Sequence, residues 1–147
     1  MKRPAQSEPW VPHDAIPAEQ TAPGVERRVL AYGPDAMCVE NRFERGAVGA
    51  MHSHPHTQIT YVVSGKFRFT IGEETREVGP GDTLLKEHGV RHGCVCLEPG
   101  ILLDFFTPMR EEFVSPYPFY SISTAPFTQE RPAGKPPGGP FPLCRAA

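Results

Sequence analysis

Short apolar segments separated by glycine or proline constrain the fold of this chain more than any other feature. In residues 66–71, KFRFTI, apolar and polar side chains alternate strictly. A period of two is typical of a half-buried β-strand, because successive side chains point to opposite faces. The other segments predicted as strands are 27–32, 37–43, 50–54, 58–63, 74–78, 83–85, 92–98 and 101–106. We place a turn at Ser64-Gly65 and a break at Pro99-Gly100. With no predicted helix, this pattern indicates an all-β, single-domain antiparallel β-barrel or jelly roll.

Proline marks the boundaries of the folded region. Of the 18 prolines, five lie in residues 1–23, eight in residues 116–147 and five in the 92 residues between. Proline-rich chain tends to be extended and builds little core. We therefore predict a Pro-rich N-terminal arm (1–24), a β-barrel (25–115) and a Pro-rich C-terminal tail (116–147).

The predicted barrel is small, and a core of this size is marginal on its own. We therefore expect a homodimer, or tails that pack onto the barrel. Four aromatic side chains near the second boundary would form a sizeable apolar patch if they were all exposed. We expect them to pack on the barrel or on a dimer mate; they are Phe113, Tyr117, Phe119 and Tyr120.

Composition excludes several classes of partner. A formal net charge of -2 gives no electrostatic reason to bind nucleic acid or an anionic membrane. The first residues carry no apolar run typical of a signal peptide, and no 18-residue apolar stretch predicts a transmembrane helix. The four cysteines do not form a dense framework, so we expect reduced thiols and a cytoplasmic location.

Histidines are crowded where one predicted strand ends and the next begins. His52 and His54 are two residues apart on a strand, so they point the same way, roughly 6.5–7 Å apart along the chain. Gln58 opens the strand that follows, and its amide oxygen can reach the same point. His92, on a distant strand, completes a set of four ligands. His56 has the same parity, but Pro55 is expected to turn it away.

The remaining histidines and the cysteine pair have simpler interpretations. His13 and His88 lack neighbouring ligands and are expected to be ordinary surface residues. Cys94 and Cys96 share a face with His92. Small buried strand residues are favoured over thiolate ligands, because histidines already fill a coordination sphere.

The first histidine cluster lies in a motif with a known parallel. The pattern Gly46-x5-His52-x-His54-x3-Gln58-x6-Gly65 resembles the first motif of the cupin superfamily, with glutamine where many cupins carry glutamate. Cupins are antiparallel β-barrels that bind one metal ion inside the barrel through such residues.

A second segment resembles the other cupin motif. The pattern Gly81-x5-Glu87-x-Gly89-x2-His92 matches its spacing, with glutamate where proline is usual. The resemblance to the superfamily covers residues 25 to about 107.

Three longer segments resemble a narrower group, the small cupins of pectin and alginate breakdown. The segments are MHSHPHTQITYVVSGKFRFTI, EVGPGDTLL and LLDFFTPMREEF. The resemblance implies an enzyme that linearises 4,5-unsaturated uronate monosaccharides to a 5-keto-4-deoxyuronate. It also implies that the metal is held by His52, His54, Gln58 and His92, and that Asp104, Phe106 and Arg110 surround the substrate.

Residue chemistry is consistent with this implication. Three neutral imidazoles and a neutral amide leave a divalent ion its full charge, which favours Lewis-acid chemistry, and Gln58 cannot act as a base. Asp104 is then the candidate for proton transfer, since an aspartate between apolar residues of a barrel strand is costly without a partner or a role. A solvated, outward-facing Asp104 is the alternative. Arg110, just beyond the strand, can grip a carboxylate or form an ordinary surface ion pair. Phe106 contacts substrate or simply belongs to the core.

Other functions remain open. The alternatives are a three-histidine Fe(II) oxygenase of a small molecule and a non-enzymatic, metal-loaded sugar-binding or sensor protein. The ligand set suits one divalent transition metal, which can be Zn, Ni, Fe, Mn or Co. On the favoured interpretation the partner is a small acidic sugar.

Overall fold

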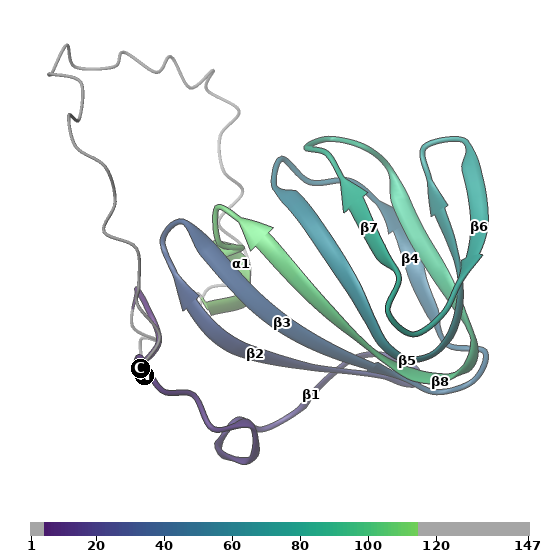
Figure 1. Cartoon of the computed structure of the whole chain (residues 1–147). Coiled ribbons are helices and arrows are strands. Elements are labelled where there is room, and N and C mark those ends of the chain that lie inside the picture. The colour runs from purple at the N-terminus through teal and green to yellow at the C-terminus, as the bar shows by residue number, and fades with distance from the viewer. Residues whose placement is uncertain (1–4, 115–147) are drawn as a thin grey trace, which may run out of the picture.

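The computed structural model describes residues 5–114, and nearly all of their regular structure is β-strand (Figure 1). Eight strands form one antiparallel sheet: β1 (Glu19–Ala22), β2 (Val25–Gly33), β3 (Ala36–Phe43), β4 (Val48–His52), β5 (Thr57–Ile71), β6 (Glu74–Val78), β7 (Thr83–Lys86) and β8 (His92–Thr107). Two single turns of helix accompany them, η1 (His13–Ala15) and α1 (Glu111–Val114). The predicted all-β, antiparallel fold is confirmed.

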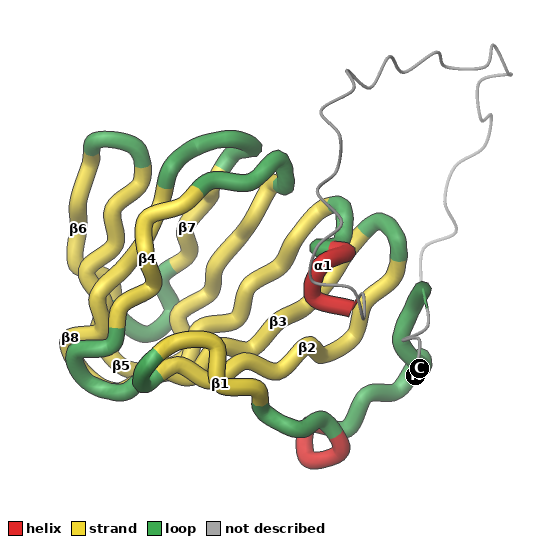
Figure 2. Tube along the Cα trace, turned by 180° about the vertical axis from the view of Figure 1, so that it is seen from behind, coloured by secondary structure: helices red, strands yellow, loops and turns green. Residues whose placement is uncertain are grey.

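The sheet curves around an interior. Its order is β1-β2-β3-β8-β5-β6, with β4 added to β8 and β7 added to β5. Both views of the chain show β2 and β3 on one side and β4, β6 and β7 on the other, while β5 and β8 extend through both parts (Figures 1 and 2). These two long strands therefore carry side chains from one part of the barrel to the other.

The turn predicted at Ser64-Gly65 and the break predicted at Pro99-Gly100 are both wrong. β5 and β8 run through these positions as continuous strands, with irregular register between Val62 and Phe67. A Cβ on Gly65 would lie 2.6 Å from the carbonyl oxygen of Pro99, and one on Gly100 would lie 2.1 Å from that of Ser64. The glycines are there because the two backbones approach closely where both strands bend.

Two apolar clusters fill the barrel. The larger consists of Val25, Phe43, Ala47, Val62, Phe67, Phe69, Leu84, Cys94, Cys96 and Leu102. The smaller consists of Met37, Val39, Phe106 and Val114. Several polar residues are buried as well, namely His54 in the loop after β4 and Gln58, Thr60, Lys86, His92 and Asp104 on strands. Buried polar groups need partners, so this set is where a functional site is expected.

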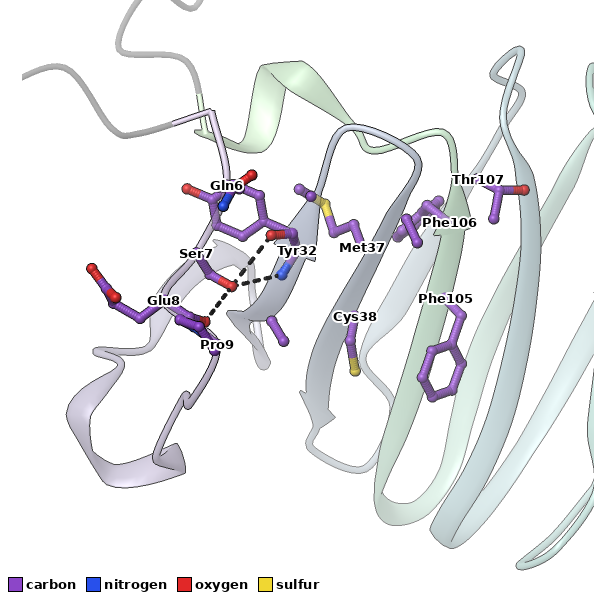
Figure 3. A pocket seen from close by; sticks show the side chains of 13 residues that line it. Gln6, Ser7, Glu8, Pro9, Tyr32, Met37, Cys38, Phe105, Phe106 and Thr107 are labelled. Atoms are coloured by element: carbon purple, nitrogen blue, oxygen red, sulfur yellow. Dashed lines mark hydrogen bonds between the residues drawn. The ribbon is translucent and has the colours of Figure 1, made fainter. Parts of the chain in front are cut away.

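The N-terminal arm takes part in the sheet, which begins at Glu19 rather than at the predicted residue 25. β1 pairs with β2, although proline density suggested loose chain here. Nearer the N-terminus, the hydroxyl of Ser7 donates a hydrogen bond to the carbonyl of Tyr32 and accepts one from the N–H of Tyr32 (Figure 3). The arm and the sheet enclose a hollow of about 460 Å³, lined on the sheet side by residues such as Met37 and Phe105.

His13 anchors the arm as well. It is partly exposed, as predicted for a surface residue, but its Nε2 lies 2.9 Å from the Glu40 carboxylate of β3. This contact raises the pKa of His13. His88, in contrast, is exposed as predicted.

The predicted C-terminal tail (116–147) lies outside the described residues, with Tyr117, Phe119 and Tyr120. Phe113 is described, and its ring packs edge-on against Phe106 at 5.8 Å between centroids. Within residues 5–114, no helix is long and apolar enough to cross a membrane.

Candidate metal centre

Three of the predicted ligands converge. His52 ends β4 and is the register partner of His92 at the start of β8, while His54 lies in the loop after β4. Ring centroids of His52 and His92 are 4.5 Å apart, and those of His54 and His92 are 4.9 Å apart. One potential ligand atom from each histidine lies within 4.8 Å of the others. The three side chains can therefore bind a single metal ion.

Backbone carbonyls orient the three rings. Each Nδ1 lies within hydrogen-bonding distance of the carbonyl oxygen of a residue two positions away, at 2.7 Å for His52, 3.1 Å for His54 and 3.0 Å for His92. With Nδ1–H donating to these carbonyls, the Nε2 lone pairs are left for the metal. Nε2 of His92 is buried, and no residue of the described chain is its hydrogen-bond partner. An orphaned buried acceptor of this kind suits a metal ligand.

Burial keeps the imidazoles of His54 and His92 neutral. It lowers the pKa of His54, and the charge of Arg110 lowers it further. It also lowers the pKa of His92 to about 4, with the Lys86 charge as the second cause. Only neutral imidazole offers a lone pair, so both side chains are ready to bind a metal at neutral pH.

Gln58 turns its oxygen toward the histidines. Its Oε1 lies 3.0 Å from Nε2 of His54, and its Nε2 donates to Oδ1 of Asp104 at 2.8 Å. When Nδ1 of His54 is the protonated nitrogen, Nε2 and Oε1 are two acceptors facing each other. A cation bound by both relieves their repulsion. Gln58 thus fits the role of fourth ligand.

His56 is not part of the three-histidine group. The carbonyl oxygen of His56 lies within hydrogen-bonding distance of Nδ1 of His54, and the His56 ring centroid is 6.4 Å from that of Phe106. The ring nevertheless stays close to the site, with its centroid 5.5 Å from that of His54, so the expectation that Pro55 turns it away holds only in that His56 is outside the ligand group.

Asp104 lies on the inner wall next to the ligands. Its side chain is 5% exposed, so the alternative of a solvated, outward-facing aspartate is wrong. Oδ1 accepts hydrogen bonds from Gln58 and Thr60, and Oδ2 accepts one from Asn41 at 2.7 Å. Both carboxylate oxygens are therefore held by hydrogen bonds from the wall.

Phe106 lies near the end of the same strand, and Arg110 lies just beyond it. Phe106 is buried and packs against His54, with 5.6 Å between centroids. The Arg110 guanidinium lies 5.2 Å from the centroid of the Phe106 ring and donates to Glu112. The interpretation of Phe106 as a core residue is correct as far as its burial goes.

Arg27 of β2 and Arg110 both lie over the ring of Phe113. Its Cζ lies 3.9 Å from the centroid of Phe113, and that of Arg110 lies 4.5 Å from it. Sequence reasoning did not select Arg27, since strand β2 carries no recognisable motif.

One cavity of about 390 Å³ connects these groups. Its lining includes the candidate ligands His52 and Gln58, the carboxylate of Asp104, and the cations Arg27, Lys86 and Arg110. Two candidate ligands, a carboxylate and three cationic side chains thus share one space. A cavity with converging polar groups of this kind is a candidate site for a small polar molecule.

The cysteines do not add ligands. Cys94 and Cys96 are buried, as the simpler interpretation predicted, and Cys94 contributes to the cavity wall. Burial raises the pKa of Cys94 to about 11, which keeps it a thiol at neutral pH. A thiol is a poor metal ligand.

Three polar residues of the network around Asp104 were missed from sequence, Asn41, Thr60 and Lys86. Thr60 shares the parity of Gln58 on β5, which is a usable signal. Asn41 and Lys86 come from β3 and β7, and only the strand register brings them to Asp104.

Comparison with known proteins agrees with the fold. Residues 40–106 match the model of the family described as Cupin domain. A curated relative, the pectin degradation protein KdgF of Dickeya dadantii, is 37% identical over 103 residues, which are 69% of this chain and 94% of that protein.

Two solved structures are also similar. An RmlC-like cupin from Shewanella frigidimarina superposes with a TM-score of 0.73 at 35% identity, covering 75% of this chain and 99% of that one. KdgF from Halomonas sp. gives a TM-score of 0.69 at 37% identity, covering 73% and 99%. This chain therefore belongs to the cupin superfamily and lies close to its pectin-degradation members.

Proposed function

We propose that this protein is a metal-dependent enzyme that opens the ring of 4,5-unsaturated uronate monosaccharides and forms 5-keto-4-deoxyuronate. The observation that carries the proposal is the Gln58–Asp104 hydrogen bond, which joins a neutral metal-ligand set to a buried carboxylate in one cavity. The relatives named for pectin degradation support this choice of substrate.

The histidines and Gln58 are the residues that would hold the metal. They are all neutral, so a bound divalent ion, whether Zn, Ni, Fe, Mn or Co, would supply Lewis-acid polarisation of substrate oxygens. The donor set requires a base from elsewhere in the cavity.

Asp104 supplies that base through Oδ2. Its Oδ1 is taken by Gln58 and by Thr60, which is not among the cavity-lining residues, whereas the Oδ2 partner Asn41 lines the cavity. An ionised carboxylate has about four acceptor sites, so Oδ2 retains room for a substrate proton. In the proposed reaction Oδ2 accepts the proton of the anomeric hydroxyl, and the bond between C1 and the ring oxygen breaks. The products of this step are an aldehyde at C1 and an enolate at C5.

The same carboxyl completes the reaction. The proton held on Oδ2 is delivered to C4, the enolate becomes the C5 ketone, and Asp104 is again ionised. The proton removed from oxygen thus ends on carbon, and the overall change is an isomerisation that needs no co-reactant.

Arg110 would hold the substrate carboxylate. Its side chain is 13% exposed and lies at the edge of the aromatic pair Phe106 and Phe113. A guanidinium binds a carboxylate through two parallel hydrogen bonds. This grip would orient C4 and the anomeric hydroxyl toward Asp104, with Phe106 limiting the position of the ring.

The test is a direct assay of the unsaturated uronate. Metal-loaded protein should remove the absorbance of the conjugated C4–C5 double bond faster than the spontaneous reaction does. Failure to exceed the spontaneous rate with every plausible metal would contradict the proposal. Oxygen consumption with a small substrate, or tight sugar binding without turnover, would instead support an oxygenase or a sensor.

We also propose a homodimer. Outward-facing apolar side chains cluster where β7, β5 and β8 adjoin, since Ile59 is the register partner of both Leu85 and Phe105, and all three are exposed. An apolar surface of this kind commonly marks an interface. Light scattering should give twice the chain mass for the wild type and for Val48→Glu, and the chain mass for Ile59→Glu. A monomeric wild-type protein would refute this proposal.

A further inference from the structure

Lys86 is a buried cation without a role in the mechanism above. It ends β7 with 2% of its surface exposed, and its register partner is Gln58 of β5. Full burial of a lysine is rare, because removing an ammonium group from water costs several kcal/mol unless partners compensate. Burial lowers the pKa of Lys86, and the Asp104 charge opposes that change.

Lys86 contacts the network around Asp104 through Thr60. Its Nζ donates to Oγ1 of Thr60 at 2.6 Å and lies 4.6 Å from the centroid of Phe69. The Thr60 hydroxyl also lies within hydrogen-bonding distance of Oδ1 of Asp104. Thr60 is therefore the bridge between an ammonium group and a carboxylate.

The bridge has a defined direction. An ammonium group can only donate, so Oγ1 of Thr60 is the acceptor from Lys86. A hydroxyl has one proton, and that of Thr60 is then available only for Asp104. Because Gln58 also donates to Oδ1, that oxygen is fully engaged on the wall side. Without Lys86, the Thr60 hydroxyl can turn, and its oxygen, which also lies 3.4 Å from Nε2 of Gln58, can accept a hydrogen bond from the protonated carboxyl group of Asp104.

We propose that Lys86 is a positioning residue, which acts through Thr60 to hold Asp104 with Oδ1 against the wall and Oδ2 toward the substrate. The inference rests on the proposed function, because it assigns Lys86 a part in the proton transfer by Asp104. The contribution is directional, since it decides which oxygen exchanges the proton.

The kinetic test uses Lys86→Met, Thr60→Val and their combination. Met has a similar length and suits a buried site next to Phe69. Each single variant should lower kcat ~10- to 100-fold, a part of the effect typical of general acid–base catalysis, with KM changed less than about threefold. Because both act on one hydrogen-bond chain, the double variant should be no slower than Thr60→Val alone. Thr60→Ser keeps the hydroxyl and should retain most of the rate.

Three outcomes would overturn the proposal. Multiplying defects in the double variant would mean that Lys86 acts by a separate route. A large rise in KM for Lys86→Met would indicate direct substrate binding. An unchanged kcat would leave Lys86 a structural residue. Lys66→Met removes an exposed lysine and serves as the matched control.

A second measurement does not depend on turnover. The ¹³Cγ resonance of Asp104, assigned with Asp104→Asn, reports the hydrogen bonds of its carboxylate in metal-free and in metal-loaded protein. It should shift in Lys86→Met and in Thr60→Val, and stay in place in Lys66→Met. An unshifted resonance in folded Lys86→Met would refute the link to Asp104. If Lys86→Met does not fold, Lys86→Gln and Thr60→Val test the same link. A wild-type protein without uronate activity would refute the proposed function alone.

Discussion

Gln58 and Asp104 are joined by a hydrogen bond of 2.8 Å, in which the amide nitrogen of Gln58 donates to Oδ1 of Asp104. The other end of the same amide faces His54 at 3.0 Å. One side chain therefore connects the histidine group with the carboxylate. A change in Asp104 should alter how the amide is oriented, and a change in Gln58 should release one of the donors to Asp104.

The first prediction concerns metal content. Elemental analysis of untagged protein should show about one divalent transition metal ion per chain, because the geometry provides one site. Replacing both His52 and His92 by alanine removes two imidazole nitrogens that would bind the metal, and should abolish stoichiometric metal binding. His88→Ala removes an exposed histidine and should leave the metal in place. Unchanged metal content in the double variant would show that the site is elsewhere.

The second prediction concerns Asp104. Asp104→Asn keeps the shape of the side chain but removes the base, so kcat on the unsaturated uronate should fall by ~10²–10⁴. Metal content should be retained, since the proposed ligands are unchanged. Asp82→Asn is the control, because Asp82 is an exposed aspartate in the turn before β7. A near-normal kcat for metal-loaded Asp104→Asn would make Asp104 a structural residue.

The candidate ligands could be predicted from the sequence because they lie close together in the chain or within a recognisable motif. His52 and His54 are two residues apart, which on a strand predicts one common face. In the structure β4 ends at His52 and His54 lies in the loop that follows, so the loop also helps to bring its ring to the other two. His92 is distant in the chain, and it was selected through its spacing within a motif. The structure brings its ring to 4.5 Å from that of His52 because β4 and β8 pair there.

Groups that depend on register were not predictable in the same way. Asn41, Thr60 and Lys86 come from three strands, and their convergence on Asp104 requires knowledge of which residues are opposite one another. The bends in β5 and β8 were missed for a related reason. Gly65 and Gly100 are turn formers in isolation, and only their mutual close approach shows that they allow two continuous strands to bend.

The third prediction concerns Arg110. Arg110→Ala removes the proposed grip on the substrate carboxylate, so KM should rise more than kcat falls if the contact is equal in ground and transition states. Loss of a charge-assisted pair is worth about 1.5–3 kcal/mol, which corresponds to ~10- to 150-fold in kcat/KM. Arg68→Ala, which breaks an exposed ion pair with Glu77, should have no effect. An unaltered KM in Arg110→Ala would leave only the surface ion pair with Glu112 as its role.

The fourth prediction concerns the stability of the metal-free protein in acid. The pKa of His92 is lowered from 6.5 to about 4 by burial and the Lys86 charge, and that of His54 is also lowered. Between these values the unfolded chain binds more protons than the folded one, so the free energy of unfolding should decrease as the pH falls from about 6.5 toward 4. Above pH 6.5 both states carry neutral rings, and these histidines should add no further pH dependence.

A comparison of the wild type with a His92 variant shows how much of that decrease is due to His92. One histidine contributes at most about 1.4 kcal/mol per pH unit. His13 opposes it, because its raised pKa adds stability below pH 6.5 that is lost at higher pH, but its exposed position makes this effect small. Urea unfolding of metal-free wild type and His92→Gln at pH 7.5, 6 and 5 measures the difference. The variant should lose less stability between pH 6 and 5, because glutamine does not titrate. Equal losses in both proteins would show that the acid sensitivity arises at other groups, and that His92 does not stay neutral through burial.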